Sequence, residues 1–167
     1  MSRGVCILFN PLLDVNIIRW YASLDGRFIV VEVTISGRNF VIVSLYGPNV
    51  DDEDFFHKLL LKLNDYPIDS LIIGGDFNFV FNLQLDKQGG LLRTNFNARS
   101  KCLELISTFD LIDIWRERNP HKKISVGGQI LLRVFAAGLI FFLFHAIWNH
   151  RLLIVFFHLA YNRTILL

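Results

Sequence analysis

Residues 70–78, Ser-Leu-Ile-Ile-Gly-Gly-Asp-Phe-Asn, form the stretch that indicates the fold most directly. The short apolar run 70–74 is bounded by turn residues and predicts a strand buried on both faces, as in a sheet that is covered on both sides. Two glycines then allow a sharp turn and the close approach of a ligand. Asp76 follows them, so its carboxylate is a candidate metal ligand, general base or structural cap.

Asp76 and Asn78 are the first candidate site residues. If the chain stays extended, their side chains face the same side, because the period of a strand is two residues. An acid and an amide on one side suit an oxygen-preferring ion such as Mg²⁺ and the orientation of a water molecule. The alternative is an Asx-turn that leads into a loop. Spacing alone leaves both interpretations open.

The preceding segment predicts an antiparallel strand pair. Residues 27–35 and 40–46 are rich in β-branched side chains, and a turn at 36–39 separates them. Tyr46 ends the second strand, just before Gly-Pro-Asn. Its phenol is a candidate donor to a phosphate oxygen near the strand end that also carries Asp76. The alternative is an edge aromatic side chain that packs on the core.

Helical patterns lie on either side of the central strand. The four carboxylates of residues 51–54 are typical of a helix N-terminus, and the apolar spacing that follows predicts a helix ending before Pro67. Residues 97–109 give a second helical pattern, and residues 5–9 a short strand. This mixture of strands and helices predicts an α+β fold or a layered α/β sandwich.

Composition excludes several classes of protein. The 167 residues are 53% hydrophobic, which excludes intrinsic disorder of the whole chain, and the net charge of +2 is too small to indicate nucleic-acid binding by itself. The two cysteines, Cys6 and Cys102, provide no disulfide framework and fit a reducing compartment. No signal peptide is recognised at the start, and we expect a nuclear or cytoplasmic location if the C-terminal tail is not inserted in a membrane.

Three blocks of sequence resemble the endonuclease/exonuclease/phosphatase superfamily. They are Ser-Leu-Tyr-Gly-Pro-Asn at 44–49, Ile-Ile-Gly-Gly-Asp-Phe-Asn at 72–78 and Asp-Leu-Ile-Asp-Ile-Trp-Arg at 110–116. Their order and spacing are most similar to the apurinic-type endonuclease domains of non-LTR retrotransposons, over residues 4–124. The resemblance implies a four-layer α/β sandwich, incomplete in this chain. It also implies Mg²⁺-dependent hydrolysis of DNA phosphodiesters.

The resemblance assigns a role to each candidate residue. Tyr46 matches the tyrosine that contacts the scissile phosphate, and Asn49 matches an asparagine on the DNA-facing loop. Asp76 matches the aspartate that orients or deprotonates the attacking water, or protonates the leaving oxygen. Asn78 matches the asparagine that positions the phosphate. DNA is therefore the partner, and Mg²⁺ the cofactor, that the resemblance implies.

Two motifs of the superfamily are not found. No strand ending in a metal-binding Glu precedes residue 4, and no Ser-Asp-His motif follows Gln129. None of the histidines after residue 120 is therefore carried over to a catalytic role. Losing members of a cooperating catalytic set removes most of the rate. We therefore expect this chain to bind Mg²⁺ poorly and to have little or no nuclease activity alone.

The composition changes at residue 130. Residues 130–167 contain no acidic residue and three arginines, whereas residues 1–129 contain all 15 acidic residues. We therefore predict a partial domain over 1–129 and an apolar, helical tail over 130–167. Residues 134–148 would form a helix of about 22 Å, shorter than the roughly 30 Å of a membrane core.

Three interpretations of the tail are open: a membrane helix, a frame-shifted segment of a decayed mobile element, or a buried core helix.

Overall fold

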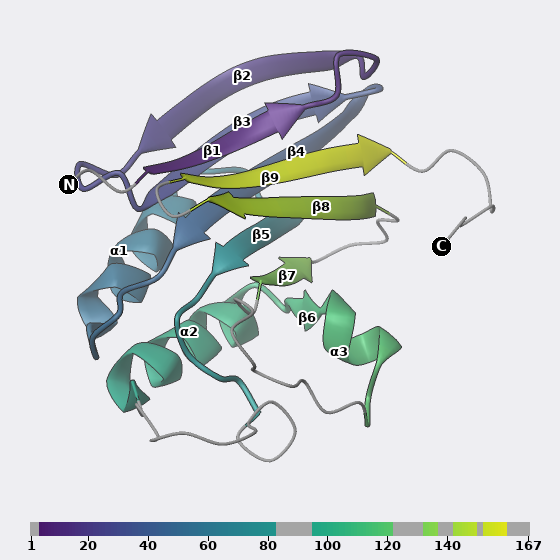
Figure 1. The fold of residues 1–167 in the computed structure, drawn as a ribbon. Coiled ribbons are helices and arrows are strands. Elements are labelled where there is room, and N and C mark those ends of the chain that lie inside the picture. Colours follow the sequence, from purple (N-terminus) through teal and green to yellow (C-terminus); the bar gives the residue numbers. More distant parts are fainter. Residues whose placement is uncertain (1–3, 83–94, 122–131, 137–141, 150–151, 160–167) are drawn as a thin grey trace.

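The computed structural model describes residues 4–82, 95–121, 132–136, 142–149 and 152–159. Two β-sheets pack against each other, and two helices cover the outer face of the larger sheet (Figure 1). The described residues thus form three layers of an α/β sandwich, as the strand and helix patterns predict. Each layer covers an apolar face of its neighbour, which is the reason such layered folds are stable.

The larger sheet has six strands, and it contains the predicted antiparallel pair. Its order is β2-β3-β4-β5-β7-β6. The strands are β2 (Val15–Ala22), β3 (Phe28–Ile35), β4 (Arg38–Tyr46), β5 (Leu71–Asp76), β6 (Ile112–Asp113) and β7 (Leu132–Ala136). Strands β3 and β4 pair antiparallel, whereas β4 and β5 pair parallel. The carboxyl ends of β4 and β5 therefore lie side by side.

The smaller sheet has the order β1-β9-β8. It consists of β1 (Gly4–Phe9), β8 (Phe142–Asn149) and β9 (Leu152–Leu159), with β1 and β9 parallel and β8 and β9 antiparallel. It lies over the face of the six-stranded sheet opposite the helices (Figure 1).

The helices agree with the predicted ranges. Helix α1 (Glu53–Leu63) buries Phe55, Phe56, Leu59 and Leu63 of its predicted apolar face, and the fifth predicted position, Leu60, is partly buried against the same core. Helix α2 (Phe96–Thr108) packs beside it, and the short α3 (Ile114–Arg118) follows β6. The acidic run begins α1 as expected, although the side chain of the N-cap residue Asp52 makes no capping hydrogen bond.

Two hydrophobic clusters fill the spaces between the layers. The helix-side core joins the helices to the six-stranded sheet, and the inter-sheet core joins the two sheets. The fully buried members of the helix-side core include Val30, Val43, Leu45, Phe56, Leu59, Leu63, Leu71 and Ile73. The buried members of the inter-sheet core are Val31, Val33, Ile35, Phe40, Ile42 and Ile72. Consecutive residues of one strand therefore serve different cores, as expected for a sheet covered on both faces.

Strand β2 was not predicted from the sequence. It is the edge strand of the six-stranded sheet, and its pairing with β3 shifts by one residue between Ile17 and Arg19. The shift is a β-bulge, which breaks the two-residue alternation of apolar side chains. Because Ile17 and Trp20 are also more than half exposed, no periodic pattern marks this strand in the sequence.

The prediction of a helical tail is wrong for the described residues of 130–167, which form β7, β8 and β9. A wholly apolar run has no periodicity that separates a helix from a buried strand. In the structure β7 pairs with β5 and β9 pairs with β1, so the tail strands have backbone hydrogen-bond partners in the rest of the chain. The boundary at residue 130 and the frame-shift interpretation stay predictions. Among the described helices, none combines the length and the apolar character needed to cross a membrane.

Candidate active site

Tyr46 and Asp76 are the last residues of β4 and β5, and they are register partners in the parallel pair. Both strands alternate between the two cores: Ile42 and Ile72 belong to the inter-sheet core, and Leu45 belongs to the helix-side core. By this period of two, Tyr46 and Asp76 lie on the face turned to the smaller sheet. The structure thus brings the two central candidate residues together at one rim.

The carboxylate of Asp76 is buried, with 6% of the residue exposed. Its Oδ1 accepts a hydrogen bond of 2.9 Å from the backbone N–H of Asn78, which is the Asx-turn considered as the alternative above. Burial raises the pKa of this carboxyl group, and the hydrogen bond from Asn78 lowers it in part. Within the described part of the chain, Oδ2 makes no hydrogen bond.

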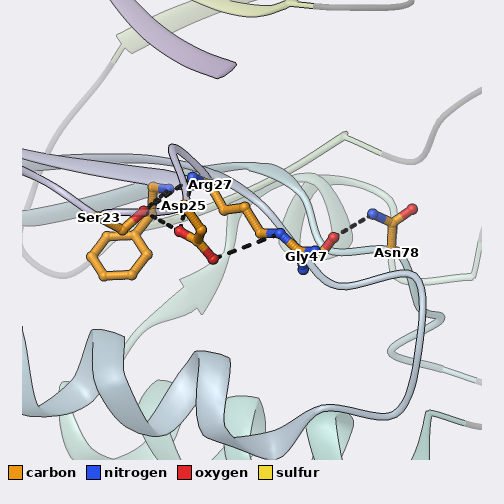
Figure 2. Close-up of polar contacts among 6 residues, drawn as sticks. Ser23, Asp25, Arg27, Gly47 and Asn78 are labelled. Atoms are coloured by element: carbon orange, nitrogen blue, oxygen red, sulfur yellow. Dashed lines mark hydrogen bonds and ion pairs between the residues drawn. The ribbon is translucent and has the colours of Figure 1, made fainter. Parts of the chain in front are cut away.

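Asn78 does not continue the strand. Its φ is +57°, in the left-handed region that Asn tolerates better than most residues. The extended conformation assumed for a shared face of Asp76 and Asn78 is therefore absent. The amide nitrogen of Asn78 instead donates to the carbonyl oxygen of Gly47 at 2.6 Å (Figure 2), so the side chain joins the loop after β5 to the loop after β4.

Asn49 lies beside Tyr46. The Tyr46 hydroxyl donates to Oδ1 of Asn49 over 3.5 Å, which is at the long limit for such a bond. All four residues predicted from the resemblance are thus found at the ends of β4 and β5 and in the loops that follow.

Two further residues hold these loops, and sequence analysis assigned neither of them to the site. The buried Asn95 donates to the carbonyl oxygens of Pro48 and Asn78, over 3.5 and 3.4 Å. Asp51 accepts from the backbone N–H of Ala98 at 2.8 Å, so an acid predicted to begin α1 caps α2. Asn95 stands two residues before the predicted helical range and is the N-cap residue of α2 in the structure, whereas no local signal identifies the partner of Asp51.

Gly75 is required by the packing of the two site strands. Its φ is +151°, and a Cβ atom there would overlap the carbonyl oxygen of Leu45. The space that sequence analysis assigned to an approaching ligand is therefore occupied by the neighbouring strand. This close approach brings the backbone of β5 against β4 one residue before Tyr46 and Asp76.

The described residues at this rim do not by themselves fit a magnesium ion. Mg²⁺ in proteins takes carboxylate oxygens together with water and substrate phosphates. The rim supplies the Asp76 carboxylate and the amide oxygen of Asn78, and no group of three or more His, Cys, Asp or Glu occurs among the described residues. What the rim offers is one buried carboxyl group of raised pKa next to a phenol.

A comparison of sequences finds a transposon protein. The chain is 31% identical over 123 residues to the "Transposon TX1 uncharacterized 149 kDa protein" of Xenopus laevis. The match covers 72% of this chain and 9% of that protein. No family model matches. The similarity includes most of the described residues, and the chain spans about a tenth of the length of this relative.

Comparison with solved structures finds similar folds at low identity. The endonuclease domain of TRAS1, a telomere-specific non-LTR retrotransposon, aligns with a TM-score of 0.48 and 15% identity, over 75% of this chain and 56% of that one. Zebrafish (D. rerio) TDP2 complexed with a single-strand DNA product aligns with a TM-score of 0.44 and 13% identity, over 80% and 60%. The catalytic domain of human Nocturnin aligns with a TM-score of 0.44 and 12% identity, over 79% and 50%.

Proposed function

We propose a function from the premise that this chain belongs to the endonuclease/exonuclease/phosphatase superfamily, in the form found in non-LTR retrotransposons. The chain presents part of a phosphodiester-hydrolysing site of the DNA endonuclease type. Tyr46 and Asp76 contact the phosphate, with Asn49 and Asn78 on the flanking loops. By itself the chain binds DNA and hydrolyses it little or not at all.

The pairing of Tyr46 with Asp76 is the observation that carries this proposal. A phenol that donates and a buried carboxyl group that accepts lie at the carboxyl ends of adjacent parallel strands. Ligands of open α/β sheets bind outside this edge, where the strands end and the loops begin. A phosphodiester placed there meets a hydrogen-bond donor and a proton acceptor from neighbouring strands.

The chemistry assigned to each residue follows from its environment. Burial raises the pKa of Asp76, which makes the carboxylate a better proton acceptor from an attacking water. The Tyr46 hydroxyl exchanges its long bond to Asn49 for a bond to a phosphate oxygen. Asn78 acts on the backbone of the neighbouring loop. Its side-chain amide nitrogen donates to the carbonyl oxygen of Gly47 and thereby joins the loops after β4 and β5.

Magnesium enters the proposal only as an ion that this class of hydrolysis uses to neutralise charge on phosphate oxygens. A single carboxylate at the rim predicts weak binding of the ion. A site that binds the ion weakly leaves this charge poorly neutralised, so we expect hydrolysis to be slow. DNA binding is therefore the better first measurement, and nicking is the second.

The test compares Asp76→Asn with Asp69→Asn. Asn at position 76 keeps an oxygen for the Asx-turn and removes the charge, and the exposed Asp69 precedes the other end of β5. Binding to a short duplex is measured by fluorescence anisotropy, and nicking is measured on supercoiled plasmid with Mg²⁺ and with chelator. We expect DNA binding by the wild type and only slight nicking. Asp76→Asn and chelator remove that nicking, whereas Asp69→Asn retains it.

Two outcomes would contradict the proposal. A wild-type chain with no salt-dependent affinity for DNA does not present a phosphodiester site. Nicking that survives Asp76→Asn at the wild-type rate removes the role assigned to Asp76. Circular dichroism melts of the three proteins separate either result from a failure to fold.

A further inference from the structure

Arg27 lies at the same level across the sheet as the register partners Tyr46 and Asp76. It immediately precedes β3, and its carbonyl oxygen accepts a hydrogen bond of 2.7 Å from the backbone N–H of Tyr46. Tyr46 in turn is the register partner of Asp76. The three residues therefore lie side by side across β3, β4 and β5, on one edge of the sheet.

The Arg27 side chain extends along this edge. Figure 2 shows it running from the turn before β3 in the direction of Gly47, whose carbonyl oxygen accepts the amide of Asn78. The side chain is 27% exposed, so the guanidinium is partly sheltered and still open to solvent. The backbone of Arg27 adjoins the end of β4 through the hydrogen bond from Tyr46, so this cationic residue lies beside the strand that leads into the Gly47 loop.

The turn that carries Arg27 is held by a local network. The hydroxyl of Ser23 accepts from the backbone N–H groups of Arg27 and Phe28, each at 3.0 Å, and donates to Oδ1 of Asp25 at 2.6 Å. Oδ2 of Asp25 lies 3.7 Å from Nε of Arg27. The aspartate that faces the guanidinium is itself held in place by Ser23.

This ion pair leaves most of the guanidinium available. Arg has five N–H donors in a planar fork, and Asp25 faces the one on Nε. Within the described residues, the two Nη groups make no hydrogen bond. A planar pair of donors matches two oxygens of a phosphate, which is why Arg is favoured where phosphate is bound in a fixed orientation.

We infer that Arg27 binds a second backbone phosphate of DNA, beside the one at Tyr46 and Asp76, and that Asp25 and Ser23 orient it for this purpose. The inference rests on the proposed function and adds a binding residue to it. The DNA strand then runs past the start of β3 and the carboxyl ends of β4 and β5, which lie on the same side of the sheet. The Nη groups provide the contact, and the Nε–Asp25 pair is retained.

The test compares Arg27→Ala with Arg38→Ala. Arg38 is exposed at the other end of the same hairpin, so both variants lose one positive charge from the same pair of strands. Duplex affinity is measured by fluorescence anisotropy between about 50 and 200 mM salt. One lost phosphate contact lowers the slope of log K against log salt by about 0.9, which is roughly a threefold smaller loss of affinity over this range. We expect this change for Arg27→Ala and no change of slope for Arg38→Ala.

Arg27→Lys sharpens the result. Lysine keeps the charge and lacks the planar fork, so the variant should keep the wild-type slope and bind more weakly at every salt concentration. Equal slopes and affinities for Arg27→Ala and Arg38→Ala would overturn the inference while the proposed function stands. A wild-type chain that fails to bind DNA would instead remove the proposed function. Thermal melts establish that each variant is folded.

Discussion

The two faces of the six-stranded sheet differ in what they carry, although alternate residues of the same strands build them. On the helix-side face, Leu45 and Ile73 join the larger core, which two helices cover. On the inter-sheet face, Ile42 and Ile72 join a smaller core, and the same face ends at Tyr46 and Asp76. Residues that stabilise the fold and residues proposed to act on a phosphate therefore alternate along the same strands. Substitutions of neighbouring residues should differ in their effects on unfolding and on DNA binding.

The largest effect is expected at Gly75, where the two site strands approach most closely. A Cβ atom at this position would overlap the Leu45 carbonyl, and the φ of +151° is unfavourable for any L side chain. Gly75→Ala should therefore cost more than about 4 kcal/mol, in the range of the most damaging substitutions, or abolish folding. Soluble yield and urea unfolding measure the effect.

Gly37 provides the control for Gly75. Its φ of +78° also disfavours a side chain, but nothing lies within 4 Å of a Cβ atom there. Gly37→Ala should cost about 1–2 kcal/mol, the strain of the left-handed conformation alone. Equal costs at the two positions would show that the contact with Leu45 is unimportant.

Adjacent isoleucines of β5 compare the two faces directly. Ile73 and Ile72 are both fully buried, in the helix-side and the inter-sheet core respectively. Truncation to Ala costs about 2–5 kcal/mol, and the cost is higher where the surroundings cannot relax into the cavity. We expect Ile73→Ala near the upper end and Ile72→Ala near the lower end, measured by urea unfolding. The reverse order would mean that the smaller core is the more rigid one.

Tyr46→Phe should have little effect on folding. The hydroxyl makes a 3.5 Å hydrogen bond to Asn49 at a part-buried position, so its removal should cost about 0.5 kcal/mol in thermal unfolding. Duplex affinity should fall, because the donor to the phosphate is lost. A large loss of stability with unchanged DNA binding would place Tyr46 among the packing residues.

Asp76→Asn should have the smallest effect on the free energy of unfolding, and this effect should depend on pH. Burial raises the pKa of the folded carboxyl group above 3.8, so the folded state binds its proton more tightly than the unfolded state does. Below pH 3.8 the carboxyl group is protonated in both states, and burying it carries no cost of ionisation. As pH rises through the folded pKa, the wild type loses stability relative to Asp76→Asn. Urea unfolding of both proteins over a pH series measures the difference, and a difference of the opposite sign contradicts the raised pKa.

Much of the fold was predicted from local sequence patterns. The apolar spacing after Asp54 correctly predicted α1, and the β-branched runs on either side of the turn at 36–39 correctly predicted β3 and β4. The helix has a clear apolar period, and the two strands are rich in β-branched residues and separated by a turn signal. The bulged strand β2 and the strands of the tail were not predicted, because one lacks a regular alternation and the others are apolar throughout.

The candidate site was predicted in part. The positions of Asp76 and Tyr46 follow from the rule that polar residues at strand ends meet at one edge, and the resemblance added Asn49 and Asn78. The left-handed conformation of Asn78 could not be predicted from spacing, because it depends on the Gly47 carbonyl from another strand end. Arg27 was not assigned to the site: the predicted hairpin already places it near Tyr46, but no sequence pattern predicts the Ser23 and Asp25 contacts around its side chain.

The hydrogen bond from Ala98 to Asp51 makes one amide proton a reporter for a distant loop. Asp51 follows β4, whereas Ala98 lies 47 residues later, in the first turn of α2. Amide hydrogen exchange at Ala98 therefore slows only while the loop after β4 is in place. A single resonance in a nuclear magnetic resonance spectrum can thus report how often the rim opens, in the absence of any ligand.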